Sequence, residues 1–106
     1  EKAVDDLIAS HAGWMAETHS LNAEDGKLHT LEYFVSKAPE LSDMMDASKG
    51  STGNVIYTVT EVHIDDEHFG KHVELGQGWS RIGEFFELFE KYAPLVTMGG
   101  RVIQKL

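Results

Sequence analysis

Two segments of the chain carry apolar residues at the spacing of an amphipathic helix. In the first segment, one face of the helical wheel holds Val4, Leu7, Ile8, His11, Trp14, Met15 and Thr18. In the second segment, the apolar stripe consists of Trp79, Ile82, Phe85, Phe86, Phe89 and Tyr92. A 3.6-residue period over such a length is typical of a helix with one face against a core. The pattern predicts helices over residues 2–19 and 79–92, and Pro94 ends the second.

Two further segments alternate from residue to residue, which is the period of a β-strand. Residues 28–36 are rich in aromatic and β-branched side chains, and residues 54–64 alternate throughout. Both faces of the 54–64 segment are largely apolar or threonine. Residues 96–106 are predicted to form a last strand, in which Gly99 and Gly100 indicate a bulge or a group close to the backbone.

Shorter elements are expected between these segments. Pro39 suits the first turn of a short helix that carries Leu41, Met44 and Met45, and the glycine-containing run 49–54 forms a loop after it. Asp65 is a good N-cap for a helix over residues 66–74, because its carboxylate can accept a hydrogen bond from the backbone of the first turn.

The predicted order is therefore helix, strand, strand, helix, strand, with short helices inserted. A further strand before residue 1 would complete β-α-β-β-α-β, the split βαβ arrangement of ferredoxin-like folds. Helices would cover one apolar face of the 54–64 strand, and a partner subunit or the segment before residue 1 would cover the other. We expect residues 1–106 to form one ferredoxin-like α+β domain that assembles into a homodimer.

The composition of the chain excludes several classes of partner and site. Nine Lys and Arg residues against eighteen Asp and Glu residues give a formal charge of -9, which repels nucleic acid and anionic membrane surfaces. Cysteine is absent, so disulfides and thiolate sites are excluded. No apolar stretch approaches the roughly 20 residues that span a bilayer, and no segment resembles a signal peptide. We expect a cytoplasmic protein with neither nucleic-acid nor membrane partners.

The stretch from Thr60 to His72, TEVHIDDEHFGKH, leads from a predicted strand into an acidic-capped helix that carries Phe and His. It resembles a pattern of the dimeric α/β-barrel superfamily, which includes antibiotic-biosynthesis-monooxygenase-like proteins and haem-degrading monooxygenases. Together with the element order, the resemblance covers most of the chain. It implies a dimeric α/β barrel and, for an enzyme, a cofactor-independent monooxygenase whose substrate itself activates oxygen.

His68 and His72 are the candidate catalytic residues. They lie at i and i+4 on one helical face, and histidine titrates near neutral pH. The resemblance implies that one of them moves a proton. The alternatives are a metal site that uses both histidines with Glu67 nearby, and a partly exposed helix whose histidines only bond locally. We expect neither a metal ion nor another cofactor.

A second group of residues is expected to line an apolar pocket. The candidate ligand-binding residues are His11, Trp14, Tyr33, Tyr57, His63, Trp79 and Arg101. Large aromatic side chains suit a small apolar or amphipathic molecule, such as a fatty-acid-like or polyketide-like acid whose carboxylate Arg101 would bind. The alternatives are core packing for the aromatic residues, a surface ion pair for Arg101, and a non-catalytic dimer. Glu61 with His63 is a further candidate acid/base pair.

Overall fold

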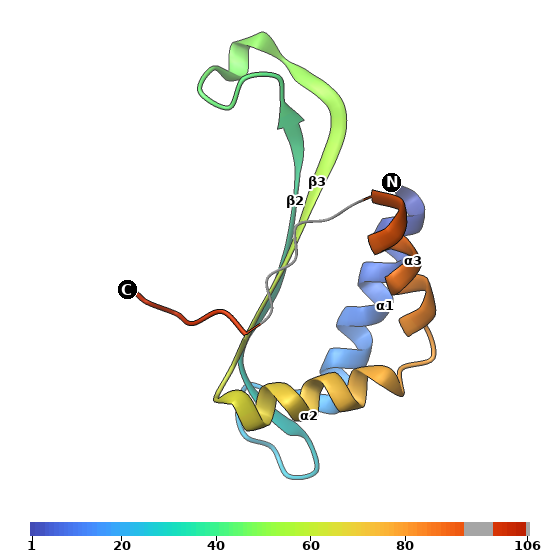
Figure 1. The fold of residues 1–106 in the computed structure, drawn as a ribbon, viewed down its shortest axis with the longest axis vertical. Coiled ribbons are helices and arrows are strands. Elements are labelled where there is room, and N and C mark those ends of the chain that lie inside the picture. The colour runs from blue at the N-terminus through green and yellow to red at the C-terminus, as the bar shows by residue number, and fades with distance from the viewer. Residues whose placement is uncertain (93–98, 106) are drawn as a thin grey trace.

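The computed structural model describes residues 1–92 and 99–105, and these residues form an α+β fold (Figure 1). The elements in chain order are α1 (Lys2–Thr18), β1 (His19–Ser20), β2 (Leu28–Leu41), the 3-10 helix η1 (Ala47–Lys49), β3 (Ser51–His63), α2 (Asp66–Gln77) and α3 (Ile82–Tyr92). The sheet order is β1-β2-β3, with β1 parallel and β3 antiparallel to β2. This confirms the α+β class and is compatible with a ferredoxin-like fold, whereas the dimer and the barrel stay predictions.

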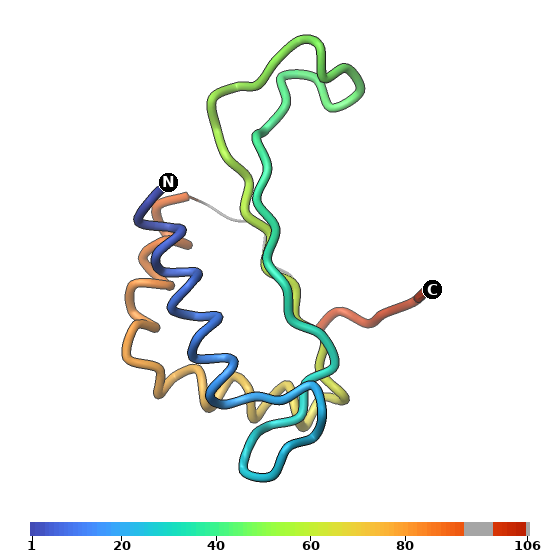
Figure 2. Tube along the Cα trace, turned by 180° about the vertical axis from the view of Figure 1, so that it is seen from behind, coloured from blue at the N-terminus to red at the C-terminus, as the bar shows by residue number. Residues whose placement is uncertain are grey.

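The long β2–β3 hairpin is the platform on which the helices lie. Figure 1 and Figure 2 show α1 along one face of the hairpin with α3 beside it. In both views α2 crosses the end of the hairpin at which β3 stops, and the other end, which carries η1, extends beyond the helices. Among the described helices, none is both long and apolar enough to cross a membrane.

Polar contacts fix α1 against this sheet face. Lys37 and Tyr57 are cross-strand partners in the hairpin. The Tyr57 hydroxyl donates to Oδ1 of Asp5 at 2.7 Å, and Nζ of Lys37 donates to Oδ2 of the same carboxylate at 2.9 Å. The Lys37 and Asp5 side chains are 39% and 43% exposed, so the pair orients α1 and adds little to stability.

The buried interior of the described residues is small and unusually polar. Its apolar members are Leu7, Met15 and Trp79, and its polar members are His11, His19 and Thr30. Buried polar groups persist in folded proteins when hydrogen bonds satisfy them. His11 and His19 are therefore core residues whose ring nitrogens need hydrogen-bond partners.

The helix predicted to begin at Pro39 is wrong. Pro39 lies within β2, opposite Val55 of β3. In the part of the chain that the structure describes, β1 is the only other strand beside β2, and it pairs with residues 28 and 29. The missing N–H of Pro39 can therefore face an edge that no described strand occupies, where proline is tolerated. Met44 and Met45 lie in the turn and are 85% and 86% exposed. The only helical turn here is η1, for which the side chain of Asp46 provides the N-cap.

The predicted last strand is not observed in residues 99–105, which form no helix or strand. Residues 96–98 and 106 of that prediction lie outside the described part of the chain. Gly99 has a φ of 76°, a left-handed conformation that glycine adopts readily. A strand also needs a hydrogen-bonded neighbour, and among residues 1–92 and 99–105 the strands β1, β2 and β3 pair only with one another.

Candidate functional site

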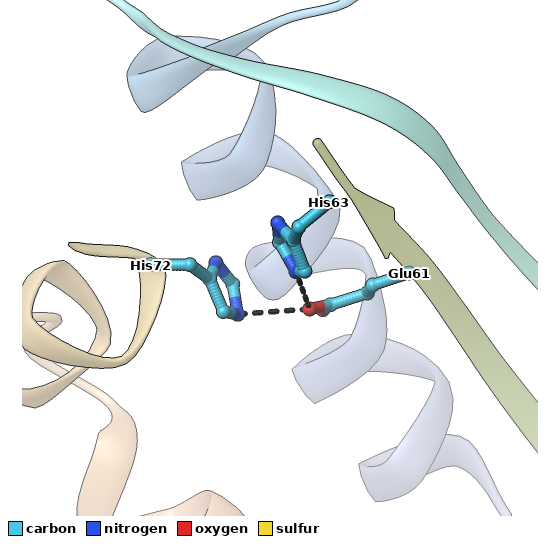
Figure 3. A group of neighbouring side chains, drawn as sticks. All are labelled: Glu61, His63 and His72. Carbon is cyan, nitrogen blue, oxygen red and sulfur yellow. Dashed lines mark hydrogen bonds and ion pairs between the residues drawn. The ribbon is translucent and has the colours of Figure 1, made fainter. Parts of the chain in front are cut away.

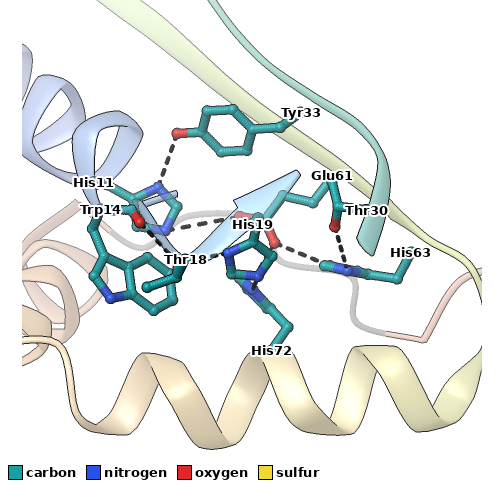
Figure 4. Close-up of polar contacts among 9 residues, drawn as sticks. All are labelled: His11, Trp14, Thr18, His19, Thr30, Tyr33, Glu61, His63 and His72. Carbon is teal, nitrogen blue, oxygen red and sulfur yellow. Dashed lines mark hydrogen bonds and ion pairs between the residues drawn. The ribbon is translucent and has the colours of Figure 1, made fainter. Parts of the chain in front are cut away.

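Four of the six histidines of the chain gather around one carboxylate, that of Glu61 (Figure 4). His11 comes from α1, His19 from β1, His63 from the end of β3 and His72 from α2. Glu61 and His63 point to the same side of β3 because they are two residues apart in a strand. The cluster therefore lies where α1, α2 and the sheet meet.

The start of α2 places His72 opposite Glu61. Asp65 caps the helix, because its side chain accepts a hydrogen bond of 2.8 Å from the backbone N–H of His68. Asp66 and Glu67 follow in the first turn, where negative charge favours the helix dipole. Nε2 of His72 then lies 2.8 Å from Oε2 of Glu61.

Glu61, His63 and His72 have the arrangement of a metal ligand set (Figure 3). One donor atom of each lies within 4.8 Å of the other two. Nε2 of His63 and Nε2 of His72 lie 3.3 Å and 2.8 Å from the same carboxylate oxygen. Ligand atoms at about 2.0–2.2 Å from a shared ion in tetrahedral or octahedral geometry are about 2.8–3.6 Å apart. The group can close around one ion with small side-chain rotations.

The three side chains are shielded from solvent. Those of His63, His72 and Glu61 are 7%, 12% and 19% exposed. Burial alone would raise the pKa of Glu61, but hydrogen bonds from His63 and His72 outweigh it and lower the pKa to about 2. The carboxylate is therefore ionised at neutral pH and can ligate a cation.

Two hydroxyl groups from outside the group of Glu61, His63 and His72 make hydrogen bonds to the histidines of the cluster. The Thr30 hydroxyl lies 3.1 Å from Nδ1 of His63, so that ring directs Nε2 towards Glu61. The Tyr33 hydroxyl lies 2.9 Å from Nδ1 of His11, whose Nε2 is 3.8 Å from Oε1 of Glu61. Such partners commonly fix the tautomer and orientation of ligating histidines.

A chain of hydrogen bonds reaches His72 from the end of α1. The Thr18 hydroxyl donates to the backbone carbonyl of Trp14 at 2.7 Å and lies 2.7 Å from Nδ1 of His19. Nε2 of His19 lies 2.9 Å from Nδ1 of His72. Burial, with His72 nearby, lowers the pKa of His19 to about 4, so this ring is neutral at pH 7.

Aromatic rings lie close to the ring of His11. Its ring centroid is 5.6 Å from that of Trp14, 5.2 Å from that of Trp79 and 5.3 Å from that of Phe85. Burial among these rings lowers the pKa of His11. Burial also raises the pKa of Tyr33, with a contribution from the charge of Glu61, to about 12.

The structure brings most of the predicted site residues together. His11, Trp14, Tyr33, His63, His72 and Trp79 lie in or against the cluster. His68 does not join it, because its Nδ1 lies 2.7 Å from Oδ1 of the capping Asp65. Tyr57 contacts Asp5 further along the hairpin, and Arg101 is exposed. His68 and His72, the predicted catalytic pair and the alternative metal site, therefore do not converge, whereas His72 lies close to His63 and Glu61.

Sequence reasoning missed His19, Thr18 and Thr30. His19 is four residues after Met15 and eight after His11, so this i, i+4, i+8 spacing was the available signal. Thr18 was placed on the apolar face of the predicted helix and Thr30 in a predicted strand. Neither was identified as the partner of a histidine, because that partner depends on the tertiary fold.

No protein-family model matches this sequence, and no curated protein or solved structure is significantly similar to it. The resemblance of residues 60–72 to the dimeric α/β-barrel superfamily therefore stays a prediction. Function has to be inferred from the geometry of the cluster.

Proposed function

We propose that this protein binds one divalent transition-metal ion through Glu61, His63 and His72. The observation that carries the proposal is the convergence of one carboxylate oxygen and two imidazole nitrogens within 4.8 Å of one another. Two histidines and one carboxylate suit zinc and iron(II), whereas calcium and magnesium prefer all-oxygen sites.

Electrostatics supports a cation at this position. Glu61 is a largely buried carboxylate whose immediate neighbours are imidazoles, and a buried charge needs a compensating partner. A dication would supply that compensation directly.

Three protein ligands leave at least one coordination position for water or a substrate. Structural zinc sites are usually closed by four protein ligands, whereas catalytic sites keep an open position. The proposed centre therefore has the ligand count of a reactive site. A metal bound there would polarise a substrate oxygen or lower the pKa of a bound water.

The test is calorimetric titration of chelator-treated protein with Zn2+, compared across four variants. His63→Gln and His72→Gln should each weaken binding by more than about 100-fold, because even outer-shell changes at metal sites cost 10–100-fold. His29→Gln and His68→Gln are matched controls, since neither histidine belongs to the ligand group, and should bind like the unsubstituted protein. Equal affinity across all four variants would contradict the proposal.

A second candidate function is the binding of a small apolar molecule, as the sequence predicts. The supporting observation is an open groove of about 360 Å³ between α1 and the sheet, lined by Asp5, Ile8, Ala9, Ala12, Tyr33, Phe34, Val35, Ser36, Lys37 and Tyr57. Its volume is within the usual range for ligand sites. A medium-chain fatty acid should raise the melting temperature, and Ala12→Trp should abolish that rise by filling the groove. An unchanged melting temperature would count against this function.

A further inference from the structure

We propose that the groove between α1 and the sheet is the substrate channel of the metal centre, and that its substrates are medium-chain acyl compounds whose carbonyl oxygen points to the ion. The channel rests on the proposed function, because it leads to an ion only if Glu61, His63 and His72 bind one. The groove and the cluster share the face of the hairpin that α1 covers.

The pairing of β2 with β3 places the groove directly beside the cluster. Tyr33 is the cross-strand partner of Glu61. Val35 and Lys37 follow Tyr33 on the same face of β2, and all three residues line the groove. At about 3.3 Å per residue, the groove extends roughly 13 Å from residue 33 to residue 37. One of its ends is therefore adjacent to a proposed metal ligand.

The two ends of the groove differ in their polar groups. At the far end, the carboxylate of Asp5 accepts hydrogen bonds from Tyr57 and Lys37, so these groups already satisfy one another. At the near end, the Tyr33 hydroxyl lies 2.9 Å from Nδ1 of His11 (Figure 4). Asp5 and His11 are six residues apart, which is about 9 Å along the helix. A polar head group of a ligand is therefore expected at the near end.

The carboxylate of Glu61 joins the near end to the proposed ligands. Its Oε2 lies 3.3 Å from Nε2 of His63 and 2.8 Å from Nε2 of His72. Its other oxygen, Oε1, lies 3.8 Å from Nε2 of His11, the ring that Tyr33 contacts. Three protein ligands leave at least one coordination position open. On the side of Oε1 that position would face the groove.

Between its two ends the groove is apolar. Ile8, Ala9 and Ala12 line it from α1, and Val35 lines it from β2. The small side chains at residues 9 and 12 leave room for an alkyl chain, and an extended chain of about eight carbons is shorter than the groove. A metal ion binds and polarises a carbonyl oxygen. A medium-chain acyl compound therefore matches both the apolar groove and the ion at its end.

Alkyl hydroxamates test the channel, because the hydroxamate head chelates Zn2+ while the length of the chain varies. Zn2+ binding is measured first, and octanohydroxamate and acetohydroxamate are then titrated into the Zn2+-loaded protein. Each methylene that enters the groove should tighten binding about 2–4-fold, so octanohydroxamate should bind at least about 50-fold more tightly. Equal affinity of the two hydroxamates in a protein that binds Zn2+ would overturn the channel and leave the metal site intact.

Two tryptophan variants locate the alkyl chain. Ala12→Trp fills the groove, and Ala16→Trp makes the same change at an exposed position of α1 that does not line it. Ala12→Trp should lose most of the preference for octanohydroxamate but keep its affinity for Zn2+ and acetohydroxamate, whereas Ala16→Trp should behave like the unsubstituted protein. An unchanged preference in Ala12→Trp would overturn the channel. Where that variant does not fold, the comparison of chain lengths decides the matter.

The same titrations without Zn2+ separate the channel from the function on which it rests. A protein that binds no Zn2+ would refute the metal site and the channel together. Octanohydroxamate that binds equally tightly with and without Zn2+ would refute the channel, and it would support the groove as an independent apolar site. Octanohydroxamate that binds tightly only to the Zn2+-loaded protein supports the channel, because the binding of head and chain is then coupled.

Discussion

The substitution Glu61→Gln tests whether the carboxylate of residue 61 is a metal ligand. The change keeps the shape of residue 61 and removes the only negative charge of the ligand group. Outer-shell substitutions at metal sites already cost 10–100-fold in affinity, so loss of the charged ligand should cost at least about 100-fold. Glu67→Gln makes the same change at an exposed position that pairs with Lys71, and it serves as the control.

The expected magnitude follows from linkage. Zn2+ at 100 times the dissociation constant stabilises the folded state by about 2.7 kcal/mol. For a domain of this size, that raises the melting temperature by roughly 10–20 °C. In Glu61→Gln the same Zn2+ concentration would only equal the dissociation constant, which gives about 0.4 kcal/mol and roughly 2–3 °C.

Thermal unfolding followed by circular dichroism, with and without Zn2+, measures this difference directly. The unsubstituted protein and Glu67→Gln should show the large shift, and Glu61→Gln should show almost none. A Glu61→Gln protein that gains as much as the control would refute the ligand assignment. The comparison uses the Zn2+-induced shift of each variant, so a change in the metal-free melting temperature does not affect it.

Three further predictions concern the stability of the fold. Tyr33 has a pKa of about 12 in the folded state and about 10 in the unfolded state. Its neutral form therefore contributes at most about 2–3 kcal/mol to the free energy of unfolding below pH 10, and this contribution is lost between pH 10 and 12. The free energy of unfolding, measured with urea at several pH values from about 9 to 12, should show this loss. In Tyr33→Phe the part of the loss that is due to residue 33 should be absent. Leu7→Ala should cost about 2–4 kcal/mol at a site 3% exposed, whereas Leu21→Ala, at 59% exposure, should cost well under that. Lys37→Met should change stability by less than about 1 kcal/mol despite its short contacts with Asp5; a loss above 2 kcal/mol would contradict this.

The elements with a strong period were predictable from the sequence. The helix expected over 2–19 is observed at Lys2–Thr18, and the strand expected over 54–64 is observed at Ser51–His63. The observed boundaries differ from the predicted ones where pairing with another element of the fold determines them. The strand predicted to end at residue 36 continues to Leu41, because β3 pairs with it along that length. Pro39 was interpreted as a helix start for the same reason: sequence does not show which strand edge is open.

The site was predictable only in part, because its histidines meet through the fold. The i, i+4 spacing of His68 and His72 suggested that they act together. In the structure, local bonding to Asp65 holds His68 at the start of α2, while His72 faces the sheet. His72 lies against Glu61, His19 and His63. Glu61 and His63 belong to β3, so they reach His72 only because β3 and α2 meet at the turn between them. The pair Glu61 and His63 was predictable from the sequence, because residues two apart in a strand lie on the same face.

The polar interior suggests why such a site would also matter for folding. The three buried apolar side chains of the described residues give a modest hydrophobic core, and small domains often depend on an additional cross-link. Glu61 and His63 belong to β3, His72 belongs to α2, and His19 ties the group to the end of α1. An ion bound by the three ligands would join the sheet to α2 at the point where α1 also makes contact. Because the ligands converge only in the folded chain, the free energy of metal binding would add directly to the free energy of unfolding.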